Sequence, residues 1–408
     1  MQNRVFDQCR ASRRSAVLVA LLLLPTITTG KEPDASPSRQ FVHPGIAHTQ
    51  ADLDFVRQKV KDSQQPWADA FEAAKKSPYG SLQWEPEPAA HVERGPSNNP
   101  NIGSSEFTGD AAAAYTHALI WAIGGEPDHA KKSAEIIDAW SDKLVSISNH
   151  DARLLVGMDG QDFINAAELL RHTWDGWPAT HQAAFEKMVR EIWYPIIADF
   201  YPSANGNWDA SMIQTMIAMG VFLDDRQMFD RAVNYYLEGE GNGAIGNYFN
   251  EFGECQESGR DQAHTQMGLD YLATACETAW HQGVDLYSAL DNRLLKGFEY
   301  TAKYNLGFDV PYEPYRSFEG RYYYKRISDD SRGRLRPMYE RVLNHYSNRQ
   351  GLEAEFTRQA ALRLRERSAG QEDDGRRRNR RRGRRSQGSL PWDTLMYARQ
   401  NQPSLPPG

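Results

Sequence analysis

Cysteine is scarce in this chain of 408 residues, with only Cys9, Cys255 and Cys276. Cys9 precedes an apolar run near the N-terminus, so two cysteines remain if that region is removed. Neither their spacing nor any accompanying histidine resembles a zinc motif. A disulfide between Cys255 and Cys276 and a pair of buried thiols are both compatible with the sequence.

Long hydrophobic runs are absent after the first thirty residues. Residues 1–30 contain early arginines, an apolar stretch at 16–24, and then Pro25 and small residues up to Gly30. This order is typical of a cleavable secretory signal peptide, and the apolar stretch is too short to span a bilayer. We therefore expect a periplasmic or secreted protein without a membrane span.

An excess of positive charge is also lacking, because the formal net charge is −7. Eight arginines are concentrated in residues 376–385, so the rest of the chain is more negative than the whole. A negative body argues against nucleic acid as a partner. If the substrate is an anionic polymer, positive charge must gather locally in a cleft.

Runs of alternating strand residues do not appear, and the pattern is instead helix after helix. Without a regular repeat, this succession predicts an all-α fold, an incomplete (α/α) toroid of helical hairpins rather than a solenoid. Thr49 is a predicted N-cap, and Pro195 is expected to kink or end its helix early. Apolar residues recur at three- and four-residue spacing in segments 49–60, 67–75, 110–123, 130–146, 160–173, 179–200, 209–222, 226–238, 265–282, 290–304, 337–347 and 352–364.

The expected organisation is a signal peptide (1–30), a polar linker (31–40), one toroid domain (41–367), an arginine-rich insertion (368–386) and a C-terminal segment (387–408). The insertion has low complexity and is predicted to be disordered. It either attaches the protein to an anionic polymer or has no function. Residues 390–397 regain apolar spacing, which is compatible with docking on the toroid.

The densest group of polar side chains lies in residues 253–264, which include Glu257, Arg260, Gln262 and His264. Burying so many polar groups is costly unless each finds a partner, so their concentration indicates a ligand site. A capping network for the following helix is the structural alternative. His264 is best suited to exchange a proton near neutrality.

Five stretches resemble, in the same order, stretches of bacterial alginate-lyase-like proteins, and polysaccharide lyase family 38 in particular. They are residues 205–209, 240–245, 256–264, 283–287 and 291–300. The resemblance extends from about residue 41 to 364. It implies an (α/α)-toroid fold and β-elimination on a uronic-acid polymer, either alginate or glucuronan.

A uronate lyase removes the C5 proton, neutralises the neighbouring carboxylate and protonates the departing O4. No metal or other cofactor is needed if protein groups supply the neutralisation. His264 suits the base, and the resemblance assigns the base to the same position. Arg316 suits the neutralising role by its charge, and Glu257 suits it only if protonated or as an orienting group. An ion pair between Glu257 and Arg260 is the structural alternative.

Tyr322 is the predicted acid, because it follows Arg316 at the spacing that the resemblance implies. Tyr323 and Tyr324 are close rivals, and Tyr324 is also expected to bind substrate. The aromatic content, with 10 Trp and 19 Tyr, suits sugar stacking, although many of these rings will be core.

The remaining predicted substrate-binding residues are Asn207, Trp208, Arg260, Gln262 and His117. Asn207 and Trp208 lie in a turn where related toroid lyases place an amide against the carboxylate, and Trp208 stands where another alginate lyase family carries histidine. Arg260 is expected to orient or bind rather than to carry a proton, because a guanidinium does not release one. His117 has a core position as its more ordinary explanation.

Two other functions fit the same sequence. A glycoside hydrolase on this fold would need two opposed carboxylates, for which Glu257 with Asp261 or Asp209 are the candidates. A non-catalytic polysaccharide-binding protein would use the aromatic side chains as a platform. The expected partner of the leading function is an anionic polysaccharide, and the sequence does not specify the uronan, the linkage or the oligomeric state.

Overall fold

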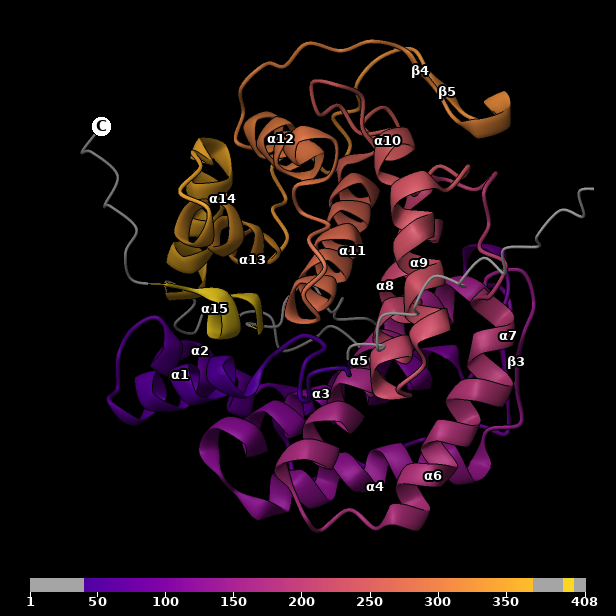
Figure 1. Cartoon of the computed structure of the whole chain (residues 1–408), viewed down its shortest axis with the longest axis vertical. Coiled ribbons are helices and arrows are strands. Elements are labelled where there is room, and N and C mark those ends of the chain that lie inside the picture. The colour runs from indigo at the N-terminus through magenta and orange to yellow at the C-terminus, as the bar shows by residue number, and fades with distance from the viewer. Residues whose placement is uncertain (1–39, 370–391, 400–408) are drawn as a thin grey trace, which may run out of the picture. The chain divides into compact units, whose positions relative to one another are not determined.

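The computed structural model describes residues 40–369 and 392–399 (Figure 1). The predicted signal peptide, nearly all of the linker and most of the arginine-rich insertion lie outside the described residues. None of the described helices combines the length and apolar composition that crossing a membrane requires.

The described chain is an all-α toroid of helical hairpins, as expected. Four long helices form its inner layer, and each packs against the next. These are α3 (Ser104–Gly124), α5 (Ala152–Thr173), α8 (Gly206–Phe222) and α11 (Gln262–His281). The helices that follow them form the outer layer: α4 (Pro127–Lys143), α6 (Ala179–Met188) with α7 (Tyr194–Ile197), α9 (Arg226–Glu238) and α12 (Ala289–Asn305), and a last hairpin joins α13 (Tyr339–Leu343) to α14 (Glu355–Ala369).

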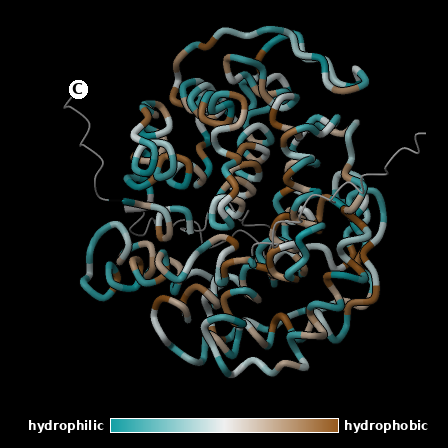
Figure 2. The backbone as a smooth tube through the Cα atoms, in the orientation of Figure 1, coloured by the Kyte–Doolittle hydropathy of each residue, from teal (hydrophilic) through white to brown (hydrophobic). Residues whose placement is uncertain are grey.

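The two layers differ in how much of each helix is buried. Helix α8 is buried on nearly all sides, whereas α9 buries one stripe that includes Met228, Phe229 and Ala232. This contrast is typical of an inner and an outer helix, and hydrophobic and hydrophilic residues are interspersed along the helices in Figure 2. Gly157 lets α5 approach α8, because a Cβ atom there would lie 2.5 Å from the Ser211 Oγ.

Most helix boundaries agree with the prediction. Thr49 caps α1 (Gln50–Lys61) in a capping box with Asp52. Beyond a π-helical turn at Val189–Trp193, α7 contains Pro195 and ends at Ile197, as expected from the proline. Helices α3 and α5 begin six and eight residues before their predicted starts. The first turn of α3 carries polar residues that interrupt the apolar periodicity, whereas α5 begins with an apolar run that the prediction left out.

Two small sheets also occur in the described chain. Strand β1 (His91–Arg94) pairs antiparallel with β2 (Asn101–Ile102) and parallel with β3 (Ser146–Ser148). Strand β4 (Tyr315–Arg316) pairs antiparallel with β5 (Tyr323–Tyr324). Strands of two to four residues are too short to produce a detectable alternation, which is why the sequence pattern indicated only helices.

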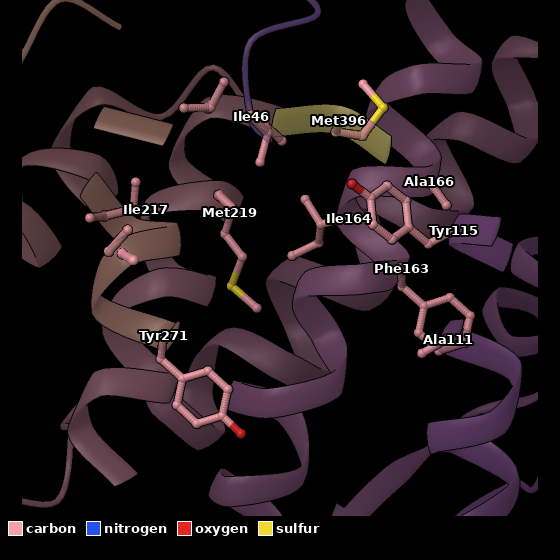
Figure 3. Packing of buried hydrophobic residues seen from close by; sticks show 14 of the residues in the cluster. Ile46, Ala111, Tyr115, Phe163, Ile164, Ala166, Ile217, Met219, Tyr271 and Met396 are labelled. Carbon is pink, nitrogen blue, oxygen red and sulfur yellow. The ribbon is translucent and has the colours of Figure 1, made fainter. Parts of the chain in front are cut away.

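The C-terminal helix α15 (Trp392–Tyr397) packs against α1, α2 (Trp67–Lys76) and α13. Its Asp393 carboxylate accepts hydrogen bonds from the backbone of Glu340 and Arg341 at the start of α13. Met396 belongs to the same buried cluster as Ile46, and Figure 3 shows the two near each other. Helix α15 therefore closes the ring between its last hairpin and its first helices.

The two described cysteines are buried free thiols. Cys276 lies on α11, where its Sγ donates to the hydroxyl of Tyr236 at 3.2 Å. Cys255 lies in the loop before α11 and is 1% exposed. Of the two possibilities that the sequence leaves open, the structure contains the thiols and not the disulfide.

Replacing Leu395 by alanine tests the role of α15. Leu395 is fully buried, so the substitution should lower the free energy of unfolding by about 2–5 kcal/mol, measured by urea denaturation. Leu352→Ala is the matched control, because Leu352 is 39% exposed and its loss should change stability by about 0.5 kcal/mol or less. Equal effects of the two substitutions would show that α15 is not part of the core.

Candidate functional site

The inner helices α8 and α11 begin side by side. The Gln256 Oε1 and the Glu257 Oε2 accept hydrogen bonds from the backbone N–H groups of Gly206 (3.0 Å) and Asn207 (2.8 Å). The first N–H groups of a helix have no partner within it, so these side chains cap α8. The polar segment 253–264 thus acts partly as a capping network, for α8 as well as for its own helix.

The carboxylate of Glu257 lies at the centre of this region and is fully buried. Besides the Asn207 N–H, it accepts hydrogen bonds from the Tyr248 hydroxyl at 3.0 Å and from the Arg260 Nη1 at 2.8 Å. Three donors satisfy it, and none of its surface is open. Of the roles predicted for Glu257, direct action on the substrate does not fit its burial, whereas an orienting role does. Its ion pair, named above as the structural alternative, positions Arg260, and its hydrogen bond with Asn207 positions the start of α8.

His264 is held by two neighbours. Its Nδ1 lies 2.6 Å from the Asp261 Oδ2, and its Nε2 lies 3.0 Å from the Arg260 Nη2. Because a guanidinium can only donate, Nε2 is the acceptor and the imidazole proton resides on Nδ1, where it is donated to Asp261. Although burial opposes it, these bonds lower the pKa of Asp261. The His264 side chain is 35% exposed, so it can meet a ligand.

Arg260 supplies the positive charge of the cluster. Its side chain is 27% exposed and lies between the carboxylates of Glu257 and Asp261, the second at 3.7 Å from its Nε. The guanidinium therefore has a fixed orientation and an open side. A carboxylate arriving at the rim would meet this charge next to the imidazole of His264.

Asn207 and Trp208 form the neighbouring part of the rim, in the first turn of α8. Asn207 is 1% exposed, and within the described chain its Oδ1 has no hydrogen-bond partner. Trp208 packs edge-to-face against Tyr201 at 5.4 Å and against His150 at 5.3 Å. Trp208 thus supplies an aromatic wall, whereas the side chain of Asn207 is buried.

The β4–β5 ribbon approaches the cluster through Tyr324. The Tyr324 hydroxyl donates to the Asn205 Oδ1 at 3.4 Å. A Cβ atom on Gly259 would lie 2.3 Å from the Tyr324 Cβ, so glycine is required for this approach. Burial raises the pKa of Tyr324, while the nearby charge of Arg260 acts in the opposite direction.

The ribbon separates the predicted pair of Arg316 and Tyr322. Residues paired across antiparallel strands share a face, and Arg316 pairs with Tyr323. The Arg316 guanidinium lies 4.5 Å from the centre of the Tyr323 ring, and both side chains are exposed. Tyr322 shares the opposite face with Tyr324, and their rings lie parallel at 6.5 Å. The structure therefore does not bring Arg316 to the cluster.

Gln262 and His117 also lie apart from the open rim, and their predicted binding roles are corrected. The Gln262 amide donates to the carbonyls of Ser258 and Ser328 and accepts from Asn305, so its capacity is used internally. His117 is fully buried between α3 and α4, with its Nδ1 at 2.7 Å from the His129 Nδ1. Burial lowers the pKa of His117 to about 3, so it is a neutral core histidine.

A cavity of about 1680 Å³ occupies the interior of the described toroid. None of the cluster residues lines it, and Met267, one turn after His264, is the nearest lining residue along α11. Burial raises the pKa of Asp110 to about 6 and that of Asp393 to about 7. A wall rich in carboxyl groups matches an anionic polymer poorly, so the rim is the better candidate site. The lining carboxyl groups include Asp110, Asp159, Asp162, Asp270 and Asp393.

The roles of three contributing residues were missed in the sequence, where Asp261 was considered only as a hydrolase carboxylate. Asp261 is the N-cap of α11 and orients His264, and an aspartate three residues before a histidine at a helix start is a recognisable capping signal. Tyr248 and Asn205 reach the cluster from other parts of the chain. Their contacts depend on tertiary packing and leave no local signal.

Comparison with known proteins gives a consistent result. The family model for alginate lyase matches residues 48–309. An alginate lyase from Bacteroides ovatus is similar in structure, with 12% identity and a TM-score of 0.55 over 79% of this chain and 98% of that one. Alginate lyase A1-III from Sphingomonas species A1 has 14% identity and a TM-score of 0.57 over 77% of this chain and 91% of that one. A variant of alginate lyase A1-III in complex with a tetrasaccharide has 16% identity and a TM-score of 0.57 over 79% of this chain and 92% of that one. No curated protein matches in sequence.

Replacing Glu257 by glutamine tests its central position. The substitution removes the buried charge that faces Arg260, and hydrogen bonds to charged groups contribute roughly 1.5–3 kcal/mol each. We expect the free energy of unfolding to fall by about 2 kcal/mol, measured by chemical denaturation. Asp128→Asn is the control, because Asp128 is an exposed partner of Lys131 and should contribute at most about 1 kcal/mol. A Glu257→Gln effect no larger than the control would contradict this role.

Proposed function

The chain belongs to the alginate lyase family and is a polysaccharide lyase, and from this premise we propose an exported enzyme that cleaves alginate or glucuronan by β-elimination. The observation that supports it most is the group of Arg260, His264 and Tyr324 at the rim: a cation, a base and a hydroxyl in one place. Export is proposed from the signal-peptide pattern of residues 1–30.

Hydrolysis is the less suitable chemistry for this site. A glycoside hydrolase needs two carboxyl groups open to the sugar on opposite sides of the bond. Glu257 and Asp209 are each at most 1% exposed, and Asp261 is engaged with His264. Among the described residues, these three carboxyl groups therefore do not form a pair that is open to a sugar.

The substrate carboxylate is proposed to bind at Arg260. In the free enzyme, the Arg260 Nη2 donates to the His264 Nε2 and occupies the lone pair that a base requires. A carboxylate beside the guanidinium would attract this N–H group and release Nε2. Substrate binding and activation of the base would then be one event, with the other N–H group, on Nη1, held in place by Glu257.

A further feature favours a sugar at this rim. Trp208 and Tyr201 provide aromatic surface beside it for the sugar ring.

In the proposed reaction, the His264 Nε2 removes the C5 proton, and Asp261 stabilises the resulting imidazolium. The C5–H electron pair forms the C4–C5 double bond as the C4–O4 bond breaks. Arg260 stabilises the charge that develops on the carboxylate. A tyrosine hydroxyl gives its proton to O4, and the proton on His264 later returns to the tyrosinate through solvent.

We assign the acid to Tyr324 rather than to Tyr322. Of the three consecutive tyrosines, Tyr324 has its hydroxyl beside Asn205 and within the field of Arg260. Tyr322 lies next to it on the same face of the ribbon and would stack on a neighbouring sugar. The hydroxyl of Tyr323 belongs to the opposite face.

A substrate panel tests the reaction class. Elimination creates a double bond conjugated to the carboxylate, so ultraviolet absorbance should rise when the enzyme meets alginate, polymannuronate, polyguluronate or glucuronan. A neutral glucan is the control and should give no change. Release of reducing ends without a rise in absorbance would establish hydrolysis and overturn the proposal.

Single substitutions test the proposed roles. His264→Ala and Tyr324→Phe should each lower kcat by roughly a hundredfold or more, because each removes a proton-transfer group. Tyr322→Phe and Tyr323→Phe are the matched controls and should change kcat by less than about tenfold. If Tyr322→Phe is the inactive variant instead, the acid is Tyr322. Near-normal turnover of His264→Ala and all three tyrosine variants would refute the mechanism.

A further inference from the structure

A second cluster of titratable side chains lies where α5 ends. It joins His43, in the segment before α1, to Glu168 and His172, which are one turn apart on α5. One candidate ligand atom from each residue lies within 4.8 Å of the others, and among the described residues no other group of three meets this criterion. We propose that these three residues bind a divalent transition metal ion, with Zn²⁺ as the best match.

The strongest observation is the buried carboxylate of Glu168, which is 1% exposed. Its Oε1 accepts hydrogen bonds from the His43 Nδ1 at 2.8 Å and from the Gly45 N–H at 3.1 Å. Its Oε2 is also buried and has no hydrogen-bond partner in the part of the chain described. An unsatisfied carboxylate oxygen in this position is costly, and a metal ion would satisfy it.

The distances suit coordination. The His172 Nε2 lies 3.6 Å from the Glu168 Oε2, which is too long for a hydrogen bond. Two ligands that are each about 2.1 Å from a tetrahedral zinc ion are about 3.4 Å apart. The His43 and His172 rings are stacked, with their centroids 4.6 Å apart and 13° between their planes, so their nitrogens are close together and one ring must tilt for both lone pairs to reach one ion. Binding would replace the present bond between His43 and Glu168.

A second carboxylate lies behind His43. The Asp224 Oδ1 is 3.4 Å from the His43 Nε2. Histidine ligands usually donate their other ring N–H to a carboxylate, which fixes the tautomer and strengthens the ligand. With Nδ1 directed to the metal and Nε2–H to Asp224, His43 would have this arrangement. Two imidazoles and one carboxylate are a common zinc donor set, with water as the fourth ligand.

The alternative is an ordinary ion pair of His43 with Glu168, with His172 stacked beside it. That arrangement accounts for the bond at Oε1 but leaves Oε2 without a hydrogen bond. Its nearest basic group is the His172 Nε2 at 3.6 Å, on a side chain that is 27% exposed. Solvent can therefore reach the site, which gives a metal ion a route of entry.

The position favours a structural metal ion over a catalytic one. Arg153, near the start of α5, packs on Tyr201 beside the candidate active site. Glu168 lies about 23 Å farther along the helix axis, at 1.5 Å per residue. The ion would fasten the N-terminal segment to α5, next to the hydrogen bonds that Gln282 makes with Val42 and Gly45.

The test uses the whole chain with Zn²⁺ as the probe. Equilibrium dialysis at micromolar free zinc should give one bound ion per wild-type chain and none in His172→Ala. Zinc should raise the Tm of the wild type and leave that of His172→Ala unchanged, and the variant should retain normal uronan cleavage. Asp224→Asn should weaken binding by roughly tenfold.

His181→Ala is the matched control. His181 is also an exposed histidine paired with a carboxylate, Asp138, and lies outside the cluster, so this variant should keep the ion and the Tm response. Glu168→Gln should lose both, and His172→Ala remains informative if Glu168→Gln fails to fold. Equal zinc binding by the wild type and His172→Ala, or no binding by the wild type, would overturn the proposal.

Discussion

The arrangement of the rim depends on one buried carboxylate. Glu257 accepts hydrogen bonds from the first turn of α8, from Tyr248 and from Arg260. It therefore joins α8 to the segment before α11 and also fixes the guanidinium beside His264. An acidic side chain with no exposed surface is tolerated only when its partners are complete. The same three bonds that satisfy this requirement place the groups proposed to meet the substrate.

A negatively charged protein must here bind a negatively charged polymer. The protein is negative overall, and its interior cavity is lined by several carboxyl groups, yet its proposed substrate is a polyanion. At the rim, Glu257 and Asp261 cap the starts of α8 and α11 and flank Arg260, so the attraction for an anion comes from the open side of this one guanidinium. Attraction is thus confined to the place where the chemistry is proposed to occur, and it does not require a basic protein.

Much of the fold was predictable because helical periodicity is local. The bounds of α9 agree with the prediction at both ends, and Thr49 forms the expected cap. The site was predictable only in part. His264 and Arg260 belong to one short polar segment and converge as expected, and His264 also has its cap, Asp261, within three residues.

The site predictions that differ from the structure concern residues whose direction is set by tertiary packing. Gln262 looks like its polar neighbours in the sequence, but the backbone turns it inward to Ser258 and Ser328. Arg316 was grouped with Tyr322 by spacing, whereas strand pairing places the two on opposite faces of the ribbon. Neither the direction of a side chain at a helix start nor the register of a two-residue strand is encoded in the local pattern.

The closure of the ring by α15 bears on how this protein acquires its structure. The hydrogen bond from the Tyr397 hydroxyl to the Ala47 carbonyl joins residues 350 positions apart, so nearly the entire polypeptide must be available before the first and last helices can associate. Contacts at such separation carry a large loop-closure entropy and are formed slowly. Until the final residues are available, the chain would therefore form stacked hairpins with a gap between its first and last helices, and α15 would complete the core.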